Sequence, residues 1–203
     1  MFARRRLLSA ASLAATLVLT ATASPVAHAA SSGPVGGAGL GISGVAVEGA
    51  RPPSVAAKAW LIADADTGEV LAAKNAHLPL RPASTLKTLT AVTLLPKLDK
   101  QQVYKVKWAD AAVEGSAVGI VPGATYTVDD LFYGMLLPSG NDAAHALANA
   151  AGGIRKTVNM MKAEATHLNA LDTTVRNPSG LDAPHQFTSA YDLALFARAG
   201  LQR

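Results

Sequence analysis

A serine and a lysine stand three residues apart at the start of an apolar, helix-like stretch. They are Ser84 and Lys87, in the segment PASTLK of residues 82–87. Residues at this spacing share one face of a helix. A serine hydroxyl is a weak nucleophile that needs a base within hydrogen-bond distance, and a lysine kept neutral by burial can be that base. The pair therefore predicts acyl-transfer chemistry, with a helix-capping serine beside an exposed lysine as the alternative.

A second candidate site is the segment LPSGND of residues 137–142, between the end of one predicted helix and the start of the next. The hydroxyl of Ser139 can pass protons, and the amide of Asn141 can hold a substrate carbonyl or the lysine. The alternative is a plain N-cap turn, because serine, glycine and asparagine all favour such positions.

A hairpin followed by helices must position these side chains. The strand-like runs 58–63 and 69–73 flank a turn at residues 66–68 and predict the hairpin. A further short β-like run covers residues 103–108. Apolar spacing, capping residues and glycine stops predict the helices. They cover residues 86–95, 127–136, 142–151, 154–168 and 189–196.

The N-terminal part of the chain has a different composition. Residues 1–29 combine a basic start, a charge-free apolar stretch and an Ala-His-Ala end, and they predict a secretory signal peptide and export from the cytoplasm. Residues 30–53 are rich in glycine, serine, alanine and proline and predict a flexible linker. A G-x-G-x-x-G pattern at 39–44 lies in this linker with no strand before it, so a dinucleotide site is not expected. The folded domain is expected over residues 54–203.

Composition excludes several other classes of protein. The net charge of +4 includes three arginines of the predicted leader, so the rest of the chain is close to neutral and no nucleic-acid partner is expected. The absence of cysteine excludes disulfides and thiol catalysis. No metal or other cofactor is expected, because the histidines lack the close spacing of a zinc site; those after the leader are His77, His145, His167 and His185.

Taken together, the motifs resemble those of the penicillin-recognising serine hydrolases, which carry Ser-x-x-Lys, Ser-x-Asn and Lys-Thr-Gly. More narrowly, the chain resembles the low-molecular-weight penicillin-binding proteins, the serine D-alanyl-D-alanine carboxypeptidases of peptidase family S11. The turn at 66–68, the segment 82–87 and the segment NPSGLD of residues 177–182 follow one another as in that family. The resemblance covers about residues 57–200.

This resemblance implies a role for each candidate residue. Ser84 would be the acylated nucleophile, and its backbone N–H would form half of the oxyanion hole. Lys87 would be the base that activates it. Ser139 would relay a proton to the leaving D-alanine, and Asn141 would bind the substrate amide and hold Lys87.

The resemblance also implies an α+β fold of the β-lactamase/transpeptidase type, a sandwich-like arrangement with an N-terminal hairpin and a helical subdomain. The Lys-Thr-Gly motif is missing; the nearest string, at residues 156–158, lies in a predicted helix. Because a two-stranded hairpin is marginal alone, we expect the chain to be C-terminally truncated, with the sheet-completing strands and the third motif beyond Arg203.

The function expected is removal of the terminal D-alanine from peptidoglycan stem peptides, with β-lactam antibiotics as covalent inhibitors. One alternative is a non-catalytic fragment or pseudoenzyme that binds cell-wall peptides. Another is a β-lactamase, which is disfavoured because no glutamate follows Glu164 to activate a deacylating water.

Overall fold

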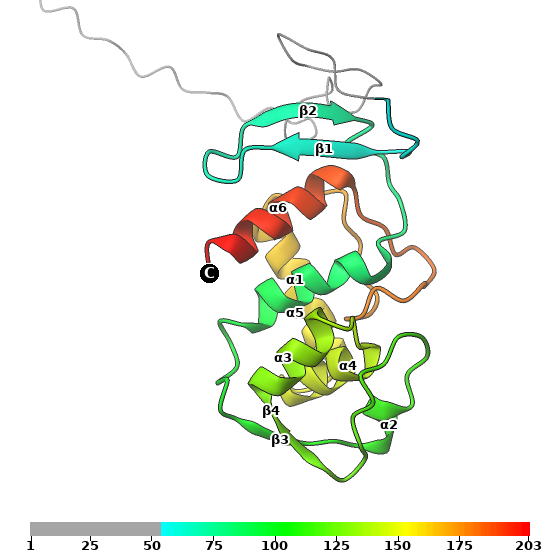
Figure 1. The fold of residues 1–203 in the computed structure, drawn as a ribbon, viewed down its shortest axis with the longest axis vertical. Helices are drawn as coiled ribbons and strands as arrows, with labels where there is room; N and C mark the ends of the chain where they lie inside the picture. Colours follow the sequence, from blue (N-terminus) through cyan, green and yellow to red (C-terminus); the bar gives the residue numbers. More distant parts are fainter. Residues whose placement is uncertain (1–53) are drawn as a thin grey trace, which may run out of the picture. The chain divides into compact units, whose positions relative to one another are not determined.

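Two small antiparallel sheets and a set of helices make up the part of the chain that the structure describes, residues 54–203 of a computed structural model (Figure 1). The signal peptide and linker predicted for residues 1–29 and 30–53 lie outside the described residues. Among residues 54–203, no helix is both long and apolar enough to cross a membrane.

The predicted N-terminal hairpin is confirmed, with slightly shifted ends. Strand β1 (Trp60–Ala63) pairs antiparallel with β2 (Val70–Lys74). Its turn is held by Asp64, whose side chain accepts hydrogen bonds from the backbone N–H groups of Asp66 and Thr67 at 3.0 and 2.7 Å. The hairpin packs against helix α6 (Ala190–Leu201) through β1.

The sequence predicted only one of the two strands of the second sheet. Strand β3 (Val103–Lys105) falls within the predicted β-like run and pairs with β4 (Thr125–Thr127). Strand β4 was not predicted, and only its last residue, Thr127, was assigned to an element, the start of a helix. A four-residue helix, α2 (Trp108–Ala111), was not expected. Elements this short show no period of side-chain polarity from which they can be predicted.

The helices predicted after this sheet are confirmed. Thr127 caps α3 (Val128–Leu136), and its hydroxyl oxygen accepts from the backbone N–H of Asp130 as the capping-box pattern predicted. Ser189 caps α6 in the same way by accepting from Asp192 N–H. The other two are α4 (Asn141–Ala150) and α5 (Ile154–His167).

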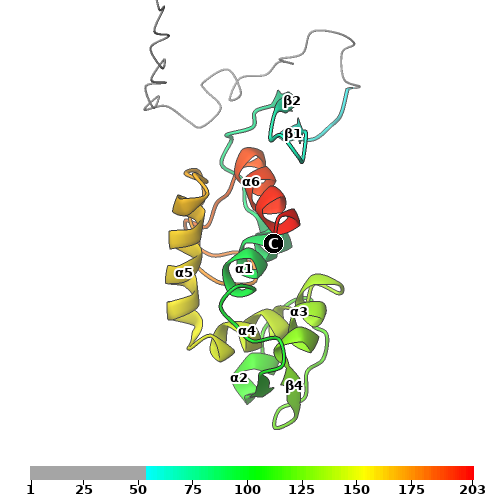
Figure 2. The ribbon, with the colours of Figure 1, turned by 90° about the vertical axis from the view of Figure 1, so that its left-hand side faces the viewer.

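Helix α1 (Lys87–Leu94) is central to the packing, because α3, α4, α5 and α6 all contact it (Figures 1 and 2). A 3₁₀ turn, η2 (Ala83–Leu86), leads into it. The sequence predicted one apolar stripe along a helix of residues 86–95. The helix is instead buried almost all round, as expected for an element enclosed by neighbours on every side.

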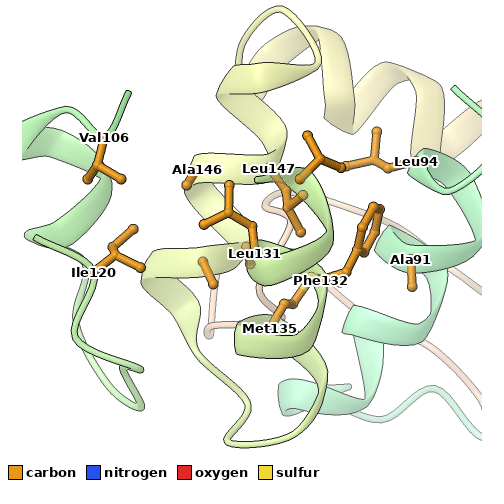
Figure 3. Close-up of a cluster of buried hydrophobic side chains, with 12 residues drawn as sticks. Ala91, Leu94, Val106, Ile120, Leu131, Phe132, Met135, Ala146 and Leu147 are labelled. Carbon is orange, nitrogen blue, oxygen red and sulfur yellow. The ribbon is translucent and has the colours of Figure 1, made fainter. Parts of the chain in front are cut away.

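Two apolar clusters fix α1 from opposite directions. Ala91 and Leu94 join a cluster with α3 and α4 side chains that include Leu131, Phe132 and Leu147 (Figure 3). The other cluster contains Leu86 and Leu89 together with residues of α5, α6 and the intervening loop; these are Val158, Met161, Ala165, Ala170, Val175 and Phe196. Close packing on both sides leaves the first turn of α1 little freedom to shift.

Candidate active site

Ser84 lies in the 3₁₀ turn before α1, and its side chain is exposed. It opens on a cleft of about 450 Å³ whose walls come from residues 83–84, 114–116, 180–182 and Asn141. The serine does not cap the helix, since no side-chain cap hydrogen bond is present at this end. Because Ser84 lies just before the start of α1, the partial positive charge of the helix N-terminus is close to its hydroxyl.

Lys87 is the buried partner of this serine, with only 2% of its surface exposed. Its Nζ lies 2.9 Å from Ser84 Oγ, 2.7 Å from Asn141 Oδ1 and 2.9 Å from the backbone oxygen of Ser179. None of these three neighbours is a carboxylate. Because Lys87 is buried and Ser84 makes no cap hydrogen bond, the alternative of a capping serine beside an exposed lysine is wrong.

Burial lowers the pKa of Lys87 to about 8, because the charged ammonium loses its hydration and gains no anionic partner. The neutral form of Lys87 is therefore more populated near neutral pH than that of an ordinary lysine. A neutral amine has two hydrogens and one lone pair. The oxygens of Asn141 and Ser179 only accept hydrogen bonds, so they take the two hydrogens and leave the lone pair directed at the Ser84 hydroxyl.

The orientation of the Asn141 amide follows from its other contacts. It is the first residue of α4 and is 4% exposed. Its Nδ2 donates to the backbone oxygen of Glu114 at 2.7 Å, and its backbone N–H donates to the Ser116 oxygen at 2.7 Å. With the NH₂ group occupied by a carbonyl, the amide oxygen must face Lys87.

Asp142 fixes the loop that carries Glu114 and Ser116. Its carboxylate accepts from the backbone N–H groups of Val118, Gly119 and Ile120 at 3.0, 2.8 and 3.1 Å. Burial alone would raise the pKa of Asp142, but these backbone donors hold it below its ordinary value. One wall of the cleft is thus attached to the start of the helix that bears Asn141.

The loop of residues 177–181 supplies the Ser179 carbonyl, and its residues 180 and 181 also line the cleft. Gly180 in this loop has φ +83° and packs so closely on the turn before Ser84 that an added Cβ would lie 1.7 Å from the Ala83 oxygen. The sequence predicted a loop here and assigned no role to Ser179. A backbone acceptor is independent of residue type, so only the match of the whole NPSGLD segment pointed to this position.

Ser139 is the one predicted site residue that the structure does not join to the others. It lies two residues before Asn141, is partly buried and has φ +63°, an uncommon conformation for a residue other than glycine. Its hydroxyl makes no hydrogen bond within residues 54–203. Ser84, Lys87 and Asn141 form the connected cluster, and the predicted relay role of Ser139 stays a prediction.

Within residues 54–203, no three His, Cys, Asp or Glu side chains are grouped as metal ligands. His77 instead bonds Asp172 through Nδ1 at 2.8 Å.

At the cleft, exposed Arg81 pairs with Asp182, which lines it.

Comparison with known proteins identifies the fold as that of the penicillin-binding proteins. The crystal structure of a D-alanyl-D-alanine carboxypeptidase from Mycobacterium tuberculosis superposes with a TM-score of 0.74 at 40% identity, over 76% of this chain and 60% of that one. Penicillin binding protein 6B from Escherichia coli superposes with a TM-score of 0.71 at 35% identity, over 75% and 52%. The expected α+β, transpeptidase-like fold is confirmed.

The chain belongs to the D-alanyl-D-alanine carboxypeptidase family, peptidase family S11, whose sequence model matches residues 46–203. The D-alanyl-D-alanine carboxypeptidase DacB2 of Mycobacterium tuberculosis is 41% identical to it over 151 residues, which are 73% of this chain and 52% of that protein. The chain thus spans about half the length of this relative. The resemblance inferred from the motifs is confirmed.

Proposed function

We propose that this protein is a serine D-alanyl-D-alanine carboxypeptidase that removes the terminal D-alanine from peptidoglycan stem peptides through an acyl-enzyme at Ser84. The observation that carries the proposal is the 2.9 Å approach of a buried lysine amine to an exposed serine hydroxyl at a cleft. The family to which the chain belongs supports the choice of reaction.

In the proposed acylation step, the Ser84 oxygen attacks the carbonyl carbon of the peptide bond between the two D-alanines while neutral Lys87 takes the hydroxyl proton. The backbone N–H of Ser84 stabilises the resulting oxyanion. The carbon–nitrogen bond then breaks, and the leaving amine of D-alanine receives through Ser139 the proton that Lys87 took, which returns the lysine to its neutral form. Asn141 binds the substrate amide in addition to holding Lys87.

Deacylation returns the enzyme to its starting state. Water adds to the ester carbon, the bond to Ser84 Oγ breaks, and the serine oxygen regains a proton while the shortened peptide leaves as a carboxylic acid. A β-lactam follows the same first step and opens its ring, which leaves a covalent adduct on Ser84. Peptidoglycan stem peptides and β-lactams are therefore the proposed partners, and an extracytoplasmic location follows from the predicted leader.

Release of free D-alanine from a peptide ending in D-alanyl-D-alanine tests this function. We expect the full-length protein that contains this chain to release D-alanine, and we expect prior treatment with one equivalent of benzylpenicillin to block the release. Binding of the peptide without any D-alanine release would favour the non-catalytic alternative. Repeated turnover of benzylpenicillin without lasting inhibition would favour a β-lactamase and contradict the proposal.

A further inference from the structure

Two side chains one helical turn apart on α1 bind consecutive carbonyls of the 177–181 loop. Lys87 donates to the backbone oxygen of Ser179, and the hydroxyl of Thr90 donates to that of Pro178 at 2.6 Å. Thr90 has no exposed surface. Its shorter hydrogen bond thus goes to the residue directly before the one whose oxygen contacts the lysine amine, and Met161 Sδ lies 3.6 Å from the same hydroxyl.

Gln186 also holds this loop, at both of its ends. It is 1% exposed, and its side-chain oxygen accepts from the backbone N–H groups of Arg176 and Asn177 at 2.9 and 3.1 Å. Its Nε2 donates to the Leu181 oxygen at 2.7 Å. A single buried amide therefore connects the residues at the two ends of the loop that contains Ser179.

These contacts bear on the direction in which the neutral amine of Lys87 presents its lone pair. The lone pair faces Ser84 only while both amine hydrogens have fixed acceptors, Asn141 Oδ1 and the Ser179 oxygen. If the Ser179 oxygen moves away, the amine can rotate a hydrogen towards the serine hydroxyl. A base that presents a hydrogen in place of a lone pair cannot accept the proton, and small misplacements of reacting groups cost large factors in rate.

We infer that Thr90 and Gln186 are positioning residues that hold the Ser179 carbonyl against Lys87 and thereby orient the base. Neither side chain touches the cleft, and each acts through the loop. The inference rests on the proposed function, in which Lys87 is the base for Ser84.

The test separates the binding of benzylpenicillin from the rate of the acylation step that follows, in the full-length protein that contains this chain. Thr90→Val keeps the volume of the side chain and removes its hydroxyl. We expect it to slow acylation about 10-fold or more, with the dissociation constant of the non-covalent complex unchanged. Thr90→Ser should restore most of the rate.

Thr93→Val is the matched control, because Thr93 is equally buried on the same helix and its hydroxyl donates to the Leu89 oxygen within α1. It should acylate at the wild-type rate. Gln186→Met, which removes all three loop contacts, should slow acylation at least as much as Thr90→Val. If Gln186→Met does not fold, the threonine series alone decides the question.

Acylation of Thr90→Val within twofold of wild type, or equal slowing in Thr93→Val, would overturn the inference. Failure of the wild-type chain to be acylated would instead contradict the proposed function. In that case an NMR titration of the Lys87 side chain still tests the contact. We expect the Lys87 pKa to fall in Thr90→Val, because the ammonium loses a fixed acceptor, and to stay constant in Thr93→Val; an unchanged pKa in both variants would contradict the inference.

Discussion

Replacing Lys87 by arginine should slow acylation of Ser84 by benzylpenicillin about 10²- to 10⁴-fold, the usual contribution of a general base, although the positive charge is kept. Arginine stays protonated at every accessible pH and has no lone pair for the serine proton. Stopped-flow measurement of adduct formation checks this result. Lys74→Arg is the control, because Lys74 lies on β2 outside the cleft and its one side-chain hydrogen bond among residues 54–203 is to the Ala57 oxygen.

The pH dependence of the wild-type acylation rate is a second test of whether Lys87 is the base. The neutral amine is the active form, so the acylation rate should rise as the pH approaches the Lys87 pKa of about 8 and level off above it. Lys87→Arg should lose this rising limb. An arginine variant that is acylated within tenfold of wild type, with the limb intact, would mean that another group is the base.

Replacing Gly180 by alanine should lower both the thermal stability and the acylation rate, the latter about 100-fold or more. The added Cβ would lie 1.7 Å from the Ala83 oxygen and 2.6 Å from the Ala83 carbonyl carbon, so the 177–181 loop or the turn before Ser84 must shift. Thermal unfolding and adduct formation, measured on the same sample, report the two effects.

Gly123→Ala separates this steric clash from backbone strain. Gly123 has φ +86°, close to the +83° of Gly180, and nothing lies within 4 Å of the position of its Cβ. Alanine in this left-handed conformation costs about 1 kcal/mol of folding free energy, so Gly123→Ala should be slightly less stable and fully active. Equal effects of the two substitutions would show that the contact between Gly180 and Ala83 does not position Ser84.

The connected part of the site could be predicted because side-chain chemistry and spacing both identify it. Ser84 and Lys87 had to share a face of any helix that began in this segment, and Asn141 lay in a segment of matching type. The Ser179 carbonyl could not be predicted from residue type, since every residue carries this acceptor. It needs the tertiary contact that α1 makes with the 177–181 loop.

The same distinction applies to the fold. Helices whose ends are set by local sequence were predicted, and features that depend on tertiary contacts were not. Long helices with clear caps, such as α3 after Thr127 and α6 after Ser189, were predicted because local sequence determines where they begin. The full burial of α1 was not predicted, because threonines and a lysine are typical of a solvent-exposed helix face. Thr90 and Lys87 are buried because the loop supplies acceptors for them, whereas the Thr93 hydroxyl bonds within α1.

Peptide mapping by mass spectrometry after reaction with benzylpenicillin tests the central claim, the acylation of Ser84, most directly. We predict one penicilloyl group per chain, located at Ser84, and no adduct in Ser84→Ala. Ser54→Ala, which changes an exposed serine outside the cleft, should retain the adduct. An adduct on another residue, or one that survives in Ser84→Ala, would contradict the assignment of Ser84 as the nucleophile.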